Sequence, residues 1–295
     1  MSAARVSLGI LVVLYGAARV AQAFPDQVSL PALAAAHVLL PLLFALIHGA
    51  QVYRVRGVLI FTALCLVVGN LLENLSILTG FPFGRYHFTE VMGPKLFYVP
   101  LLLGLAYVGM GYLSWTLARL ILGDVQEPLT GSRVMTRPLV AAFLMVAWDL
   151  SMDPIWSNLA HGWVWHDGGP YFGVPVSSFL GWYLTVYLIY QLFALYLRGR
   201  PANGPPPAAF WRLAVLMYGI CAAGNLLVIS PPGLSVITDA AGVQWRVKDI
   251  LAVCKLFSIF GMGAFVLISW VRITDDQRLS RHSPKARSRT LADES

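Results

Sequence analysis

The chain has 295 residues, of which 58% are hydrophobic and only 12% are charged, roughly half the charged share of a soluble domain. A formal net charge of +7 is compatible with nucleic-acid binding, but the basic residues lie between apolar runs, which is typical of a protein at a membrane surface. The three cysteines lie inside apolar runs and form no Cys-x-x-Cys pair, so neither a disulfide framework nor a zinc site is indicated.

Apolar runs of about 20 residues, each long enough to span a bilayer, recur along almost the whole chain. They predict an all-α polytopic membrane protein with about eight transmembrane helices, near residues 6–24, 32–53, 57–79, 96–122, 137–153, 178–198, 209–230 and 249–272. Residues 1–274 then form a single transmembrane domain. The charged residues 275–295 are expected to form a disordered cytoplasmic tail, and the proline-rich residues 199–208 a cytoplasmic linker.

The basic residues divide unequally between the two sides of these spans. Fifteen Lys and Arg residues fall on one side, whereas the other side holds only Arg85, Lys95, Arg246 and Lys248. The positive-inside rule therefore predicts a multi-pass protein of the inner (cytoplasmic) membrane with both termini in the cytoplasm. The first 24 residues resemble a signal peptide with an Ala-x-Ala site at 21–23. We expect this helix to be retained, because only then is the number of spans even.

The loops on the other side carry strand-like patterns. Residues 163–172 and 235–247 each predict a short hairpin with a turn at its centre. Together with residues 83–88 they could form a lid over the outer ends of the helices. The alternative is that the tryptophans of these loops form an interfacial aromatic belt, and the two readings are compatible. The tryptophans concerned are Trp156, Trp163, Trp165 and Trp245.

Polar side chains within the predicted spans form the candidate site, because such groups are costly in a bilayer and often functional. Helical spacing places Asn70 beside Glu73 and Asn74, and Asp149 beside Asp153. Given the predicted orientation, these side chains lie in the outer halves of their helices. The same holds for Asn225, Asp249 and Lys255. The structural alternative is a hydrogen-bonded network between helices, with Lys255 pairing with Asp249 and Asp153 ending its helix before Pro154.

Several segments outside these polar positions have a family resemblance. Residues 79–89, 93–100, 147–150, 169–175 and 178–182, in this order, resemble the carotenoid-biosynthesis membrane family that includes the CruF-type carotenoid 1,2-hydratases and the bisanhydrobacterioruberin hydratases. The resemblance covers residues 57–272 and implies addition of water to the terminal double bond of an acyclic carotenoid end, as in lycopene or γ-carotene. The product is a tertiary alcohol. Such a reaction needs no metal, nucleotide or redox cofactor, and its partner is a carotenoid in the bilayer; contacts with other carotenoid enzymes stay open.

The reaction requires a general acid, a stabilised tertiary cation and a positioned water. Two neighbouring carboxyl groups in an apolar setting tend to hold a proton between them. We therefore expect Asp149 or Asp153 to supply the proton, while the other carboxylate, with Glu73, stabilises the cation or activates the water. The amides Asn70, Asn74 and Asn225 would position the water. The aromatic rings of Tyr86, Trp148 and Trp182 would line the pocket. The remaining candidates would hold the lid or lie at the same level as the carboxyl groups: Arg85, His87, Lys95, Asp249 and Lys255. For Arg85 and Lys95 the expected partners are Glu90, Asp153 or Asp167.

Two other functions remain open on the same residues. In a membrane prenyltransferase, Asp149-x-x-x-Asp153 and the Asn70–Asn74 segment would bind a magnesium diphosphate with Arg85 or Lys248 as clamps. In a proton-coupled transporter or lipid-binding protein, the carboxylates would relay protons.

The predicted topology can be tested with a reporter inserted at residue 165. We expect a reporter that works only outside the cytoplasm to be active there, and one that works only in the cytoplasm to be active when fused after residue 290. A cytoplasmic residue 165 would contradict the topology and favour the prenyltransferase.

Overall fold

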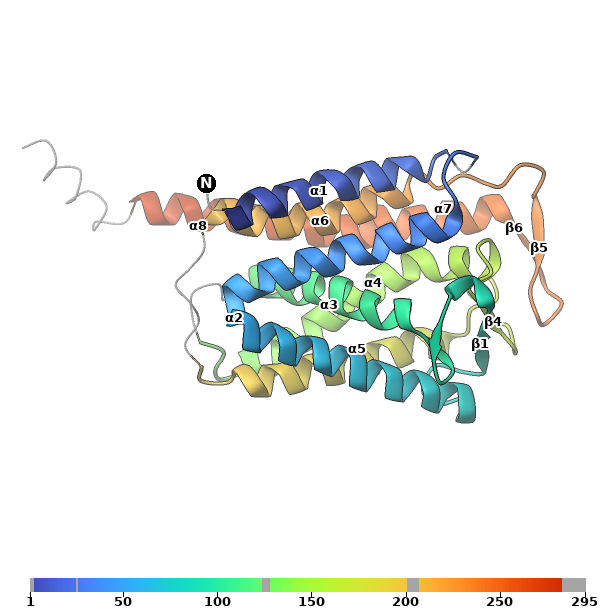
Figure 1. The fold of residues 1–295 in the computed structure, drawn as a ribbon, viewed down its shortest axis with the longest axis horizontal. Coiled ribbons are helices and arrows are strands. Elements are labelled where there is room, and N and C mark those ends of the chain that lie inside the picture. Colours follow the sequence, from blue (N-terminus) through green and yellow to red (C-terminus); the bar gives the residue numbers. More distant parts are fainter. Residues whose placement is uncertain (1–2, 25, 124–127, 201–206, 283–295) are drawn as a thin grey trace, which may run out of the picture.

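The structure is a computed structural model that describes residues 3–24, 26–123, 128–200 and 207–282. Its helices lie roughly along one common axis (Figure 1). Within the described residues, six helices are long and apolar enough to cross a membrane, which confirms the all-α polytopic fold. The helices are α1 (Ala3–Ala21), α2 (Leu30–Thr79), α3 (Leu101–Ile121), α4 (Arg133–Asn158), α5 (Val176–Leu197), α6 (Ala208–Asn225), α7 (Val247–Leu256) and α8 (Gly263–His282).

The bundle contains eight rod-like helical segments, which differ from the eight named helices in two places. Helix α2 leaves helical geometry at Arg54 (φ 60°, ψ 167°), and its two halves run in opposite directions (Figure 1). Conversely, the π-helical residues Phe257–Met262 join α7 and α8 into one rod. Helix α8 extends to His282, eight residues into the segment expected to form the tail, and the rest of that segment lies outside the described residues. Residues 201–206 of the predicted linker also lie outside the described residues.

Helix α4 continues through two prolines, although a helix end was expected before Pro154. A proline inside a helix frees the carbonyl four residues earlier. The carbonyl of Leu150, freed by Pro154, accepts the Tyr171 hydroxyl at 2.8 Å. The carbonyl of Val134, freed by Pro138 in the same way, accepts the Gln191 amide at 3.3 Å. Each freed carbonyl therefore has a side-chain partner, as an apolar environment requires, and α4 ends only at Asn158.

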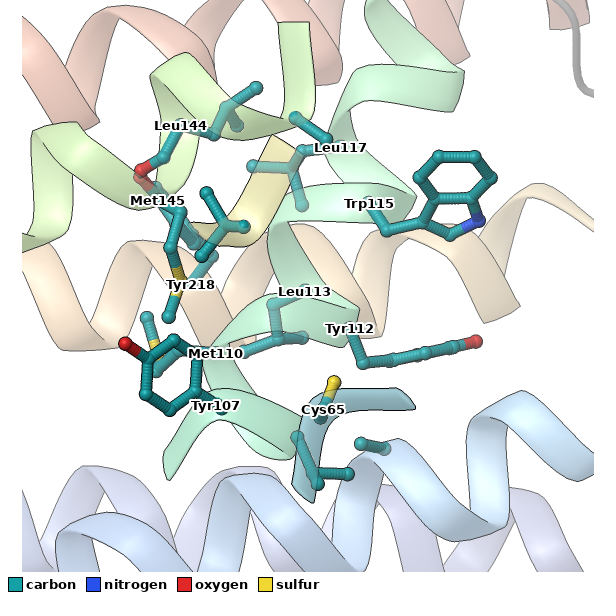
Figure 2. Close-up of a cluster of buried hydrophobic side chains, with 14 of the residues drawn as sticks. Cys65, Tyr107, Met110, Tyr112, Leu113, Trp115, Leu117, Leu144, Met145 and Tyr218 are labelled. Atoms are coloured by element: carbon teal, nitrogen blue, oxygen red, sulfur yellow. The ribbon is translucent and has the colours of Figure 1, made fainter. Parts of the chain in front are cut away.

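Helix α3 lies at the centre of the bundle and is buried along most of its length. Figure 2 shows Tyr107 and Met110 on one side of this helix and Tyr112 and Trp115 on the other. Met145 of α4 belongs to the same buried cluster. Because α3 is surrounded, a polar side chain on it has to find its partner inside the protein.

Short strands gather at one end of the bundle, which we call the hairpin end, and the chain begins and α8 finishes at the opposite end (Figure 1). Strand β5 (Val236–Thr238) pairs with β6 (Gln244–Arg246), which confirms the hairpin predicted for 235–247. Strand β2 (Lys95–Leu96) pairs with β3 (Val99–Pro100), and this pairing delays the start of α3 to Leu101. The short helix Glu90–Met92 lies just before β2.

The hairpin predicted for residues 163–172 is wrong, because β4 (Trp163–Trp165) pairs instead with β1 (Tyr86–Phe88) from the preceding loop. Alternation along these strands turns Tyr86, Trp163 and Trp165 into the protein and His87 outward. Since Trp163 and Trp165 are only 7% and 6% exposed, neither belongs to a lipid-facing aromatic belt. The two loops close over the helix ends as one small sheet, and we use lid for this β1–β4 sheet.

The outer surface of the lid is held by polar pairs. Arg85 forms an ion pair with Asp167, and Lys95 forms one with Glu90 at 2.8 Å, so neither cation pairs with Asp153. His87 Nδ1 lies 2.7 Å from His166 Nε2. The hydrogen bond from Arg85 lowers the pKa of Asp167. Partial burial, together with the neighbouring His166 and Lys95, lowers the pKa of His87.

Close packing of α2 against α3 depends on Gly109. A Cβ at this position would lie 2.9 Å from the Leu42 backbone nitrogen and 3.0 Å from Pro41. We expect Gly109→Val to lower the free energy of unfolding by roughly 1–3 kcal/mol, measured as a lower Tm in detergent. The control is Gly9→Val, because a Cβ at Gly9 of α1 meets no atom within 4 Å. Equal Tm values for both variants would contradict this packing.

The lid should weaken as the pH falls. Because the pKa of His87 is lower in the closed lid than its ordinary value of about 6.5, the closed lid binds fewer protons than the open segment. Its stability is therefore complete above that value and declines as the pH drops below it. Hydrogen exchange of the β1 and β4 amides, corrected for intrinsic rates, should show this slope between pH 8 and pH 5. His87→Gln should flatten the slope.

Asp167→Asn is the matched comparison. Because the pKa of Asp167 is lowered by Arg85, this carboxylate stays ionised over the same pH range in both states. The variant should reduce protection at every pH and leave the slope unchanged. A slope that survives in His87→Gln would assign the pH dependence to another group.

Candidate functional site

Three carboxyl side chains meet inside the hairpin half of the bundle. Glu73 comes from α2, and Asp149 and Asp153 come from α4. They are 3%, 0% and 1% exposed, and Asp149 interacts electrostatically with both of the others. Glu73 lies six residues before the end of α2 and Asp153 five before the end of α4, so both sit roughly 8–9 Å below the helix ends. The predicted cluster of these carboxylates therefore exists.

Glu73 is held by two phenols. The Tyr107 hydroxyl of α3 donates to its Oε1 at 2.6 Å, and the Tyr86 hydroxyl of β1 donates to its Oε2. Burial, and next the Glu73 carboxyl, raise the pKa of Tyr86 well above its ordinary value, so this phenol keeps the proton that it donates. The Tyr107 ring stacks on Trp182 with 4.6 Å between the ring centroids. The Glu73 carboxyl of α2 thus bonds directly to the lid and to α3, and the stacked Tyr107 and Trp182 rings connect it to α5.

Asp153 is held by donors from the lid and α5. The Trp163 and Trp165 indoles donate to its Oδ1 at 2.8 and 3.2 Å, and the Ser178 hydroxyl donates to its Oδ2 at 3.2 Å. Three donors satisfy much of the hydrogen-bonding capacity of an ionised carboxylate, which can only accept. The environment of Asp153 therefore suits the charged form.

Asp149 has a different environment. Both of its carboxyl oxygens are buried, and neither has a hydrogen-bond partner among the described residues. An ionised carboxylate without donors in a low-dielectric interior is strongly disfavoured relative to the neutral acid. Asp149 lies one turn from Asp153 on the same helix. Neighbouring carboxyl groups in such unequal surroundings are suited to separate acid and base roles.

Two cavities lie near the carboxyl groups; Glu73 and Asp153 line the first, whereas Asp149 lines neither. The first has a volume of about 20 Å³, contains Glu73 and Asp153 in its lining, and is walled by aromatic rings, so it can hold one water molecule. The second has a volume of about 80 Å³ and shares Leu103 and Trp163 with the first. Its lining also includes Trp148 and is mostly apolar. A water-sized polar space therefore lies next to a space that suits a hydrocarbon end.

Three of the predicted pocket-lining aromatic residues are found at this site. Tyr86 and Trp182 line the smaller cavity, and Trp148 lines the larger one. Trp148 and Trp182 contact each other edge to face, with 6.1 Å between ring centroids.

The amides predicted to position water bond to groups other than the carboxyl cluster, although Asn225 lines the second cavity. The Asn74 amide donates to Asn70 Oδ1 at 3.0 Å, and Asn74 Oδ1 accepts the Tyr98 backbone N–H at 3.1 Å, so this pair fixes the β2–β3 turn. Asn225 bonds to serines of α4 and of the π-helical segment at 2.9 and 3.0 Å. None of the three bonds to a carboxyl group of the cluster.

The charged candidates lie outside the cluster as well. Asp249 pairs with Arg246 rather than with Lys255, which is partly exposed on α7. Arg85, His87 and Lys95 lie on the lid and the adjoining β2 strand.

Sequence reasoning did not assign the donors of the carboxyl groups. Tyr107 carries a hydroxyl in the middle of an apolar span, which is a usable signal for a buried partner. Trp163 and Trp165 alternate with Val164, and this period of two predicts that both indoles lie on one face of the strand. Arg19 is a cation inside the first apolar run and was likewise a signal of a buried polar site. Ser178 carries no such signal.

Comparison with known proteins identifies a family. The model of a family described as carotenoid biosynthesis protein matches residues 32–238. No curated protein and no solved structure matches. The matched segment runs from α2 to β5 and includes the three carboxyl groups and all their donors. Because it covers more than half of the chain, this membrane protein belongs to the carotenoid biosynthesis protein family.

Proposed function

We propose that the protein is a carotenoid hydratase that adds water to the terminal C1,C2 double bond of an acyclic carotenoid end. The observation that carries this proposal is the unequal partnering of three buried carboxyl groups, two of which line a water-sized cavity that shares lining residues with an apolar one. Alkene hydration needs one acid that holds its proton and one base that does not, at the same site. Family membership supports a carotenoid as the substrate.

Asp149 is the proposed proton donor. Its carboxyl group has no donors to stabilise the charged form, so the neutral acid is favoured and its proton is available. The neighbouring Trp148 lines the apolar cavity of about 80 Å³ that would receive the terminal isoprene unit. Transfer of the proton to C2 breaks the double bond and leaves a tertiary cation at C1.

The cation would be stabilised by aromatic faces and by one negative charge. Trp148 and Trp163 line the larger cavity, and their ring faces attract a cation. Asp153, held in its ionised form by three donors, provides a fixed negative charge nearby. The pre-formed hydrogen bonds hold these groups in place before the charge develops.

Water would attack from the smaller cavity. This space of about 20 Å³ is lined by Glu73 and Asp153, and either carboxylate can accept the proton that the water loses when its oxygen bonds to C1. Proton transfer among the three carboxyl groups then restores the acid form of Asp149. The sum is alkene plus water giving a tertiary alcohol, with no change in the protein.

The proposed orientation places the hairpin end outside the cytoplasm and both termini inside it, in the inner (cytoplasmic) membrane. A carotenoid dissolved in the bilayer would reach the site without crossing an aqueous phase.

The prenyltransferase alternative is less compatible with this site. The oxygens of Asp153 that would bind magnesium accept hydrogen bonds from Trp163, Trp165 and Ser178. A metal ion would have to displace these donors. The transporter alternative differs from the hydratase in its outcome, because transport leaves the mass of the carotenoid unchanged.

The decisive experiment is expression in bacteria that accumulate lycopene, followed by mass analysis of the pigments. We expect a product heavier by one water that carries a tertiary hydroxyl group. If lycopene stays unchanged, a γ-carotene strain is tested next. Unchanged pigment in both strains, with the protein present in the membrane, would contradict the hydratase and favour the alternatives.

The proton donor is tested in the same strains. Asp149→Asn keeps the side-chain shape but cannot donate an acidic proton, so hydration should fall by roughly 10²–10⁴-fold. The matched control is Asp275→Asn on the exposed surface of α8, which should keep full activity. Normal hydration by Asp149→Asn would remove this residue from the mechanism. Asp153→Asn, whose amide cannot replace the charge, should also be impaired.

A further inference from the structure

Arg19 of α1 is a buried cation without a negative partner. It is 7% exposed and lies two residues before the end of α1, at the hairpin end. Its guanidinium donates to the Cys221 carbonyl at 3.0 Å and to Asn225 Oδ1, and its Nη1 lies 3.4 Å from His37 Nδ1. None of these partners carries a negative charge. Among the described residues, no Asp or Glu forms an ion pair with Arg19.

The surrounding chain holds this guanidinium in place. A Cβ at Gly224 would overlap Arg19 Nε, so only glycine leaves room for the side chain at this point of α6. The Asn225 amide donates to Ser151 and Ser258 at 2.9 and 3.0 Å. These bonds turn the Asn225 oxygen toward Arg19. Helices α1, α4 and α6 and the π-helical segment are thus arranged around one cation.

Two nitrogen atoms of this cluster lack hydrogen-bond partners in the part of the chain that the structure describes. They are Arg19 Nε and His37 Nε2, and both are buried. A buried charge without a counter-charge is strongly disfavoured, because neutral acceptors replace only part of its hydration. The described chain supplies no counter-charge for this cation, so an anion from outside the chain would stabilise it.

A cavity leads from this cluster toward the end of the bundle. It has a volume of about 300 Å³, and its lining combines Arg19, His37 and Gln22 with apolar side chains such as Leu30 and Pro232. The exposed carboxylate of Asp26 also lines it but forms no ion pair with Arg19 among the described residues. Arg19, His37 and Asn225 also line the cavity of about 80 Å³ next to the carboxyl groups, so they separate the two spaces. The cavity of about 300 Å³ also includes residues of the segments that follow α1 and α6 at the hairpin end.

We propose that Arg19 binds the oxyanion head group of an amphiphile, and specifically the phosphate of a membrane phospholipid at the hairpin end. A phosphodiester supplies the missing negative charge and several acceptor oxygens for a guanidinium. The apolar part of the cavity lining suits the glycerol backbone and the start of an acyl chain. A carotenoid hydrocarbon has no such group, so this inference does not rest on the proposed reaction, although Arg19 also lines the cavity proposed for the isoprene end.

The test is native mass spectrometry of the full chain purified in a neutral detergent, with dioleoyl phosphatidylglycerol as the probe. We expect the wild type to retain one phosphatidylglycerol and not the uncharged dioleoylglycerol. Arg19→Gln should weaken retention by about tenfold or more, since a charge-assisted pair is lost. Gly224→Ala should do the same while leaving the charge in the chain, because the new methyl group displaces the guanidinium.

Arg246→Gln is the matched control, because Arg246 is an arginine at the same end of the bundle but is exposed and paired with Asp249. It should retain the lipid as the wild type does. Gel filtration and helix content show whether each variant is folded, and Arg19→Lys should recover part of the binding if only the charge is needed. Oleate distinguishes the source of the oxyanion: if oleate replaces phosphatidylglycerol in an Arg19-dependent manner, a carboxylate lipid fulfils the role.

Two results would overturn the proposal. One is equal lipid retention by the wild type, Arg19→Gln and Gly224→Ala. The other is equal retention of dioleoylglycerol and phosphatidylglycerol by the wild type. Neither result bears on hydration of lycopene, which is measured separately in cells.

Discussion

The need to satisfy buried carboxyl groups without water organises the hairpin end of this protein. Glu73 and Asp153 receive five hydrogen bonds between them, from α3, α5, β1 and β4. All but one of these donors are aromatic side chains. Such donors satisfy the carboxyl oxygens and at the same time fill the space around them with apolar surface. This is why the lid, which is short and has few backbone pairs, lies in a defined position over the helix ends.

The same constraint separates the polar groups of the interior into chemically different positions. Asp153 is surrounded by donors and Asp149 by none, although they are one turn apart on α4. On the other side of the apolar cavity, Arg19 is surrounded by neutral acceptors. A carboxyl group with several donors, a carboxyl group with no hydrogen-bond partner among the described residues and a cation without a counter-charge among them therefore occupy the same half of the bundle. This distribution supports both an acid-catalysed reaction on a hydrocarbon and a separate anion site.

Sequence reasoning predicted the spans and the carboxyl cluster well, for physical reasons. A bilayer sets the length of each apolar run, and carboxyl groups are so rare in such runs that Glu73, Asp149 and Asp153 stood out. The partners of these groups could not be predicted in the same way. Pairing of β1 with β4 is a contact between separate loops, and no local pattern in residues 163–172 specified it.

The passage of α4 through Pro154 was also missed, because it depends on the hydroxyl of Tyr171, a residue outside the helix. Likewise, Asn70 and Asn74 share a helix with Glu73 but bond to each other and to the β2–β3 turn. Spacing along one helix showed which side chains are neighbours. It could not show which tertiary partner each of them has.

The position of each partner along the chain also has a consequence for biogenesis. The donors to Glu73 lie 13 and 34 residues after it, and those to Asp153 lie 10, 12 and 25 residues after it. During synthesis, each of these carboxyl groups meets its donors in the next segments to leave the ribosome. By contrast, Asn225, which accepts a hydrogen bond from Arg19, lies 206 residues after it in the chain. Until α6 is inserted, Arg19 has only His37 of α2 among its partners, so docking of α6 against α1 is a late step of assembly.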